Sequence, residues 1–162
     1  MSCLLKDDVQ KILDMAVVNF QNDGILAPVL LGVFEGKKKL IALNFDLKEN
    51  KELFVGTLLN LIEQGKLTEY ILVIEAWMVK DNQGKEIDKI IKQHNSLQSH
   101  PQRREVLMVQ YCTPIEEIHF ISEIQRGTNP VSLSEWEKLE LSNSYSQGRM
   151  QSLFKKGRAV WN

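Results

Sequence analysis

The sequence predicts a single α+β domain in which two main helices pack on a mainly antiparallel sheet of about five strands. Two segments show apolar residues at helical spacing, five others are strand-like apolar runs, and short turn-forming links join neighbouring runs. We expect the order α-β-β-α-β-(α)-β-β-α. The 162 residues suit one domain, 1–162, that buries a core without disulfides or metals, with 142–162 as a loosely attached C-terminal segment.

The two main helices are predicted from their apolar spacing and from the residues at their ends. The first follows Asp7 and Asp8, either of which can cap the free amides, and Gly24 ends it. Its core-facing residues are Val9, Ile12, Leu13, Ala16, Val17 and Phe20. The second is expected over 51–64, with Gly65 in the position of a C-cap glycine.

Five strands are predicted from apolar runs bounded by turn residues. The first two, 29–34 and 39–45, flank a short glycine-containing link that favours an antiparallel hairpin. The third, 70–79, is apolar on both faces, which is typical of a central strand covered by helices on both sides. The fourth and fifth, 105–112 and 117–125, are joined by a short link that indicates another antiparallel pair.

Shorter elements are expected between and after these strands. A short helix is predicted around 86–93, followed by a loop over 95–104. After the fifth strand, 132–141 is expected to form a brief helix with Ser132 as its N-cap and Glu135 in the capping-box position.

Composition excludes several classes of protein. The net charge of −1 argues against a globally nucleic-acid-binding protein. Cys3 and Cys112 form neither a metal-type pair nor a disulfide framework, which favours a cytoplasmic location. The longest nearly apolar run, 25–34, contains Pro28 and Gly32, so the sequence predicts no membrane span.

The most informative position is Glu75, a lone acidic residue in the third strand, beside Trp77. A buried carboxylate is costly unless it has a partner or a chemical role. Arg103 or Arg104, at the entry of the fourth strand, could pair with Glu75 in a structural ion pair. Trp77 would pack over this pair, and Glu105 lies beside it in the sequence. We favour this structural interpretation over a catalytic Glu75, because structural ion pairs also perturb carboxylates.

An enzymatic alternative uses the histidine and acidic residues of the fifth strand. His119 and Glu123 share one face of that strand and, with Glu75, could support hydrolase-like acid/base chemistry. The sequence shows no nucleophile at a recognisable spacing. The three histidines, His94, His100 and His119, lack the spacing of zinc ligands, so no metal and no cofactor are expected.

The C-terminal stretch 147–162 is basic and contains no acidic residue. Its basic residues are Arg149, Lys155, Lys156 and Arg158. With Phe154 and Trp161 between them, they could bind single-stranded nucleic acid weakly through phosphate contacts and base stacking. The favoured alternative is that Met150, Leu153 and Phe154 pack back on the domain while the lysines are solvated.

Four sequence blocks resemble a group of uncharacterised bacterial, archaeal and phage proteins. The blocks are Ile74–Met78 with its Glu-Ala-Trp, His100–Met108 with its Pro-x-Arg-x-Glu, Glu123–Arg126 and Gly148–Met150. The resemblance covers the C-terminal half best. It implies the strand order and implies no reaction.

The expected order of helices and strands is also similar to JAB/MPN metalloprotease-like and deaminase-like domains. JAB enzymes carry His-x-His-Pro at the end of the third strand, where this chain has Glu75–Met78, and His100-Pro101 occurs only later. The deaminase motifs, His/Cys-x-Glu and Pro-Cys-x-x-Cys, are absent. The resemblance therefore implies a related arrangement without the metal chemistry.

Taken together, these observations predict a small interaction or binding domain without a cofactor. Its expected contact surface comprises Trp77, Arg103, Arg104 and Glu105 together with the basic C-terminal residues. The partner is a protein or small molecule, and a homodimer through an exposed sheet edge or through the apolar C-terminal segment is a further alternative. The rival hypotheses are a hydrolase-like enzyme and a single-stranded nucleic-acid binder.

Overall fold

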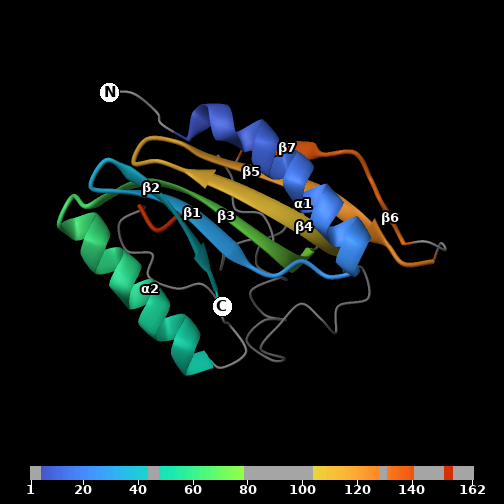
Figure 1. Ribbon diagram of the computed structural model, residues 1–162, viewed down its shortest axis with the longest axis horizontal. Helices are drawn as coiled ribbons and strands as arrows, with labels where there is room; N and C mark the ends of the chain where they lie inside the picture. Colours follow the sequence, from blue (N-terminus) through green and yellow to red (C-terminus); the bar gives the residue numbers. More distant parts are fainter. Residues whose placement is uncertain (1–4, 44–47, 79–103, 128–130, 141–151, 155–162) are drawn as a thin grey trace, which may run out of the picture.

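The fold is an α+β domain with two helices and a curled antiparallel sheet, a half-barrel (Figure 1). The computed structural model describes residues 5–43, 48–78, 104–127, 131–140 and 152–154. The helices are α1, Val9–Asp23, and α2, Lys48–Glu63, with a 3₁₀ turn, η1, at Lys6–Asp8. The strands are β1 (Val29–Phe34), β2 (Lys37–Ala42), β3 (Leu67–Met78), β4 (Arg104–Cys112), β5 (Glu117–Gln125), β6 (Ser132–Leu133) and β7 (Glu137–Glu140).

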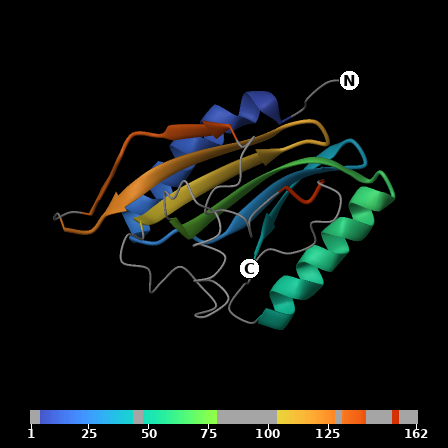
Figure 2. The same cartoon turned by 180° about the vertical axis from the view of Figure 1, so that it is seen from behind.

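The sheet runs in the order β2-β1-β3-β4-β5-β6, and β7 also pairs with β5. All of these pairings are antiparallel. The helices α1 and α2 cover opposite faces of the sheet, as the two opposite views show (Figures 1 and 2). The predicted fold class is therefore confirmed, with two more strands than the five expected.

Each face of the sheet has its own apolar core, which explains why β3 is apolar on both sides. The core under α1 consists of Leu5, Ile12, Leu13, Ala16, Phe20, Leu26, Val33, Ile71, Val73, Leu107, Val109, Tyr111 and Ile124. The core under α2 consists of Leu30, Leu43, Val55, Leu58, Leu67, Tyr70, Leu72, Ile74, Val106, Met108, Cys112, Ile121, Leu139 and Leu153. Burying each of the larger aliphatic side chains stabilises the fold by about 1.5–3 kcal/mol.

The helix α1 ends as predicted but is capped differently at its start. Gly24 adopts a left-handed conformation with φ of 73°, and its N–H donates to Phe20 O at 2.7 Å. Asp8 occupies the N-cap position, but its side chain makes no capping hydrogen bond. Asp8 Oδ2 instead accepts a hydrogen bond from Lys38 Nζ at 2.7 Å, which ties the start of α1 to β2.

The first hairpin is tighter than predicted. Glu35 and Gly36, with φ of 51° and 80°, form the whole turn, so β2 begins at Lys37 and not at 39. Two successive positive φ angles match the twist of the flanking strands, which is why such turns are common in hairpins.

The helix predicted over 132–141 is wrong. The chain forms β6 and β7 there, and both strands pair with β5. Ser134, within the expected helix, binds β5 instead: its Oγ accepts from Glu123 N–H at 2.7 Å, and its carbonyl accepts from Ser122 Oγ at 2.6 Å. Pairing with a strand already in the sheet thus overrides a short local capping pattern. The helix expected around 86–93 and the loop before Arg104 lie outside the described residues.

Neither described helix is long and apolar enough to cross a membrane.

Candidate functional site

Glu75 does not pair with Arg104, because the two side chains lie on opposite faces of the sheet. Glu75 is on the face covered by α1, with Ile71 and Val73. Its Oε1 accepts a hydrogen bond from Leu26 N–H at 2.6 Å, in the segment between α1 and β1. Arg103 and the side chain of Trp77 lie outside what the structure describes.

Arg104 pairs with Glu123 on the α2 face. Arg104 Nε and one terminal nitrogen lie 2.9 Å and 2.7 Å from Glu123 Oε2, and the two side chains are 25% and 36% exposed. Both nitrogens thus bind the same carboxylate oxygen, and the contact joins the start of β4 to β5. It occupies the carboxylate that the hydrolase hypothesis assigns to catalysis.

A second ion pair joins the same strands on the α1 face. Arg126 donates from Nε to Glu105 Oε1 and from a terminal nitrogen to Glu105 Oε2, the latter at 3.2 Å. The hydrogen bond to Glu105 is the main cause that raises the pKa of Arg126 above its ordinary value, and the negative charge of Glu75 adds to it. Glu75 therefore does not bind Arg104 as predicted. It accepts a hydrogen bond from Leu26 N–H and interacts electrostatically, at longer range, with Arg126.

The charged residues at the end of β3, at the start of β4 and at the end of β5 therefore lie at the same end of the sheet. Glu75 and Glu105–Arg126 lie on one face, and Arg104–Glu123 lies on the other. These described charged groups are matched to partners inside the domain, which makes this end a structural junction.

Glu69 is a buried carboxylate that the sequence analysis missed. It is 5% exposed and accepts a hydrogen bond from Leu5 N–H at 2.5 Å, just before η1. Glu69 and Glu75 share one face of β3, so one carboxylate binds the chain before α1 and the other binds the chain after it. The alternation of Glu69, Ile71, Val73 and Glu75 was the available signal, but the strand was expected to start at residue 70.

His119 lies in a buried polar network on the α2 face. His119 Nε2 lies 2.9 Å from Glu117 Oε2 and 2.7 Å from Gln110 Nε2. Gln110 Nε2 and Ser152 N–H also donate to Glu117 Oε2, at 3.2 Å and 2.9 Å. The His119 side chain is fully buried and that of Glu117 is 5% exposed, so neither is presented openly to a substrate.

The three residues of the hydrolase hypothesis do not converge. Glu75 faces α1, whereas His119 and Glu123 lie on the α2 face. His119 contacts Glu117 and Gln110, while Glu123 contacts Arg104. No cleft in the described part of the chain brings all three together.

The C-terminal residues 152–154 pack against the sheet. Leu153 is 3% exposed, and its N–H donates to Tyr70 Oη at 3.0 Å. Phe154 stacks on Tyr70 with ring centroids 5.7 Å apart. The prediction is confirmed for Leu153 and Phe154, whereas its third residue, Met150, lies outside the described residues. The basic residues of this stretch lie outside the described residues; they are Arg149, Lys155, Lys156 and Arg158.

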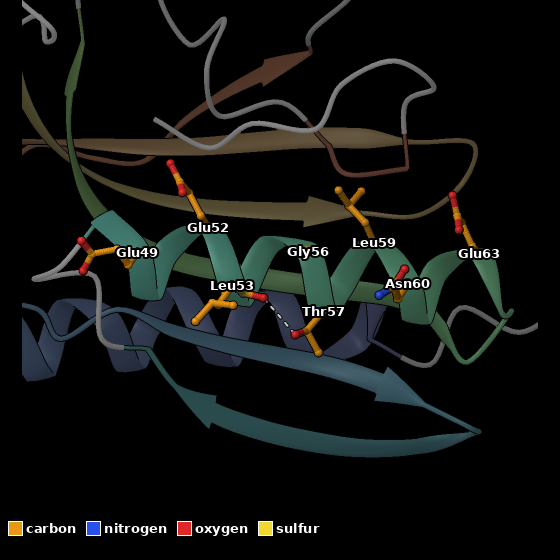
Figure 3. A pocket seen from close by; sticks show the side chains of 8 residues that line it. All are labelled: Glu49, Glu52, Leu53, Gly56, Thr57, Leu59, Asn60 and Glu63. Atoms are coloured by element: carbon orange, nitrogen blue, oxygen red, sulfur yellow. Dashed lines mark hydrogen bonds between the residues drawn. The ribbon is translucent and has the colours of Figure 1, made fainter.

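A hollow runs along one flank of α2 (Figure 3). The α2 residues that line it are Glu49, Glu52, Leu53, Gly56, Thr57, Leu59, Asn60 and Glu63. Glu52, Leu59 and Glu63 point to the same side of the helix (Figure 3). Its described lining comes from a single helix and includes no predicted site residue, so it does not assemble a site from several elements.

One edge of the sheet is formed by β2, which pairs only with β1 among the described strands, and the short strands β6 and β7 lie at the other edge. Five of its six residues are exposed, and Leu40 is 61% exposed. Lys37, Lys38 and Lys39 occupy the first half of the strand, and apolar residues occupy the second. Lys38 binds Asp8, whereas Lys37 and Lys39 have no ion-pair partner within the described ranges.

The hairpin geometry determines which β2 residues direct their main-chain N–H and C=O groups away from β1. Leu43 N–H donates to Pro28 O at 2.9 Å, so residue 43 faces β1. Hydrogen-bonded and non-hydrogen-bonded pairs alternate along an antiparallel ladder. Lys38, Leu40 and Ala42 therefore direct their N–H and C=O groups to the open edge. This surface could not be predicted because Lys37 and Lys38 were expected in the link before a strand that starts at Lys39.

Comparisons with protein-family models, curated proteins and solved structures found no match. Function is therefore inferred from the geometry of this chain.

Proposed function

We propose that this protein is a protein-interaction domain that binds an extended segment of a partner along β2. The observation that carries the proposal is the open edge itself, where Lys38, Leu40 and Ala42 direct main-chain donors and acceptors to solvent. An added strand satisfies such groups, and main-chain hydrogen bonds then supply much of the affinity.

The distribution of charge along β2 supports binding over simple protection of the edge. Lysines commonly protect an edge strand from aggregation. Here they occupy only the half nearest the turn, and Leu40, Ile41 and Ala42 continue the edge without any charge. Protection against self-pairing would favour charged residues along the whole strand. It does not explain an uncharged half in which Leu40 is 61% exposed.

The proposal keeps the predicted class of function and changes the contact surface. Arg104 and Glu105, which were expected to contact a partner, are paired with Glu123 and Arg126. If Arg104 or Glu105 left its ion pair to bind a partner, the complex would lose the stabilisation that the ion pair gives to the domain. The edge β2 has no such cost, because its outward groups face solvent.

The single-stranded nucleic-acid alternative receives less support from the described residues. Phe154, which that hypothesis uses for base stacking, stacks on Tyr70. Base stacking on Phe154 would therefore compete with a contact inside the domain.

A selection of displayed random decapeptides against the whole protein tests the proposal. Enriched peptides are expected to bind the wild type and Leu40→Ala, and to lose at least about tenfold in affinity for Leu40→Pro, or about 1.4 kcal/mol. Proline at this position removes an outward N–H but no hydrogen bond to β1. Enriched peptides that bind Leu40→Pro as tightly as the wild type would contradict the proposal.

A further inference from the structure

We infer that the partner strand runs antiparallel to β2 and is apolar in its N-terminal half and acidic in its C-terminal half. This inference rests on the proposed function and specifies the chemistry of the segment that β2 accepts.

The acidic half follows from the lysines without partners. The β1–β2 register places Lys39 opposite Gly32 and Ile41 opposite Leu30, whose side chain is in the core under α2. Lys37 and Lys39 therefore share the α2 face with Ile41. Since neither lysine has an ion-pair partner among the described residues, a carboxylate opposite each one gains a charge pair.

The position between the two acidic residues is expected to be neutral. Lys38 lies on the other face of β2, and Asp8 Oδ2 already binds its ammonium group at 2.7 Å. A second carboxylate there would compete with Asp8. The charge pattern of β2 thus calls for acidic, neutral and acidic side chains opposite Lys37, Lys38 and Lys39.

The apolar half follows from the far end of β2. Ile41 is half-buried and packs against the core under α2, while Leu40 is 61% exposed on the α1 face. Apolar side chains opposite Leu40, Ile41 and Ala42 would extend both apolar surfaces across the new strand. Cross-strand pairs of this kind each contribute about 0.2–1 kcal/mol.

The direction of the partner follows from the rest of the sheet. Every described pairing is antiparallel, and antiparallel pairing is slightly more stable per residue than parallel pairing. The residue opposite Ala42 therefore comes first in the partner, and the residue opposite Lys37 comes last.

A second copy of β2 is a less favourable occupant. A symmetric antiparallel pairing that sets Leu40 opposite Leu40 of the second copy brings the two Lys39 side chains into diagonal contact on one face. Like charges at this spacing repel, and the second copy supplies no carboxylate from β2.

Two labelled peptides of identical composition test the inference in low salt. The forward peptide carries Val-Val-Val-Glu-Thr-Glu and the control carries the reverse order, Glu-Thr-Glu-Val-Val-Val, between the same Ser-Gly flanks. Fluorescence anisotropy should show about fivefold tighter binding of the forward peptide, since in an antiparallel strand two charge pairs and three apolar pairs align only in that order. The double variant Lys37→Glu/Lys39→Glu should instead prefer Val-Val-Val-Lys-Thr-Lys.

The outcomes separate the two proposals. If both orders bind equally to the wild type and both weaken with Leu40→Pro, strand addition stands and the inferred combination of direction and side-chain chemistry is wrong. If neither peptide binds, or Leu40→Pro binds as well as the wild type, the proposed function fails as well. Circular dichroism establishes that the proline variant is folded, and Ala42→Pro replaces it if it is not.

Two further controls address other occupants. Sedimentation at high protein concentration should show a monomer, and a dimer abolished by Leu40→Pro would replace the acidic partner with a second copy. A labelled oligothymidine that binds and is displaced by the forward peptide would contradict the inference by making nucleic acid the ligand of this edge.

Discussion

At the scale of single residues, two glutamates of β3 position the first helix. Glu69 and Glu75 are six residues apart on one face, a separation of about 20 Å in a strand. A 15-residue helix such as α1 is about 22 Å long. The carboxylates can therefore bind Leu5 N–H and Leu26 N–H at the two ends of α1. The sequence could identify Glu75 as unusual. It could not identify the partner, because nearly every residue has a main-chain N–H and the sequence does not indicate which one Glu75 binds.

Removing these carboxylates should destabilise the protein to different degrees. Glu69→Ala leaves the N–H of fully buried Leu5 without its acceptor and is expected to lower the free energy of unfolding by about 2–3 kcal/mol. Glu75→Ala is expected to cost about 1 kcal/mol, because its bond is only partly buried and water can replace it. Urea unfolding measures both.

Glu63→Ala, at an exposed position of α2, is the matched control and should change stability by less than about 0.5 kcal/mol. Equal losses for Glu69→Ala and Glu75→Ala would contradict the assigned difference in burial.

Tyr70 should make the protein unstable at alkaline pH. Burial is the main cause that raises the pKa of Tyr70 well above 10.0, and its contact with Cys112 adds to it. The folded protein therefore holds this proton more tightly than the unfolded chain does. The stabilisation is complete below pH 10 and is lost as pH rises from there toward the folded pKa.

The free energy of unfolding of the wild type, measured by urea from pH 8 upward, should fall above pH 10 by about 1.4 kcal/mol per pH unit more steeply than that of Tyr70→Phe. Tyr70→Phe also loses the bond from Leu153 N–H, which lowers its stability equally at every pH. If the free energy of unfolding fell with pH equally in the wild type and in Tyr70→Phe, Tyr70 would have the same pKa in the folded and unfolded states, which would contradict the prediction.

At the scale of elements, prediction succeeded where local signals and packing agree. Gly24 and Gly65 end the two helices as expected, both with positive φ, and β5 has the predicted bounds. It failed over 132–141, where Ser132 and Glu135 match a capping box but β5 offers an edge to pair with. Capping concerns one turn, whereas strand pairing depends on where distant segments lie.

Residues 152–154 pack as part of the domain in this structure. A substitution of Leu153, which lies in the core under α2, tests this packing. Leu153→Ala should lower the free energy of unfolding by about 2–3 kcal/mol, because Leu153 is 3% exposed within the core under α2. Thermal and urea unfolding measure the change. Ile115→Ala, at a residue 93% exposed, is the control and should be nearly neutral. A loss below about 0.5 kcal/mol for Leu153→Ala would mean that the C-terminal segment is loosely attached.

At the scale of the whole molecule, the helices cover the faces of the sheet and leave its edges, of which β2 is the one that we propose binds a partner. Both faces are covered, and β2 ends the sheet because the chain passes from β2 through α2 to β3, which then pairs with β1. The sequence predicted the hairpin and the α2 helix separately. It could not predict which strand stays at the edge, because that depends on where β3 pairs.

The exchange of individual β2 amides, measured by NMR with and without the forward peptide, tests the central claim most directly. Lys38, Leu40 and Ala42 should exchange about tenfold more slowly at a peptide concentration of about nine times Kd, because a bound strand accepts hydrogen bonds from their outward N–H groups. Lys39 and Ile41, whose amides face β1, should change much less and serve as internal controls. Peptide binding that leaves Lys38, Leu40 and Ala42 unprotected, and instead protects α2 or the β4–β5 turn, would contradict binding at this edge.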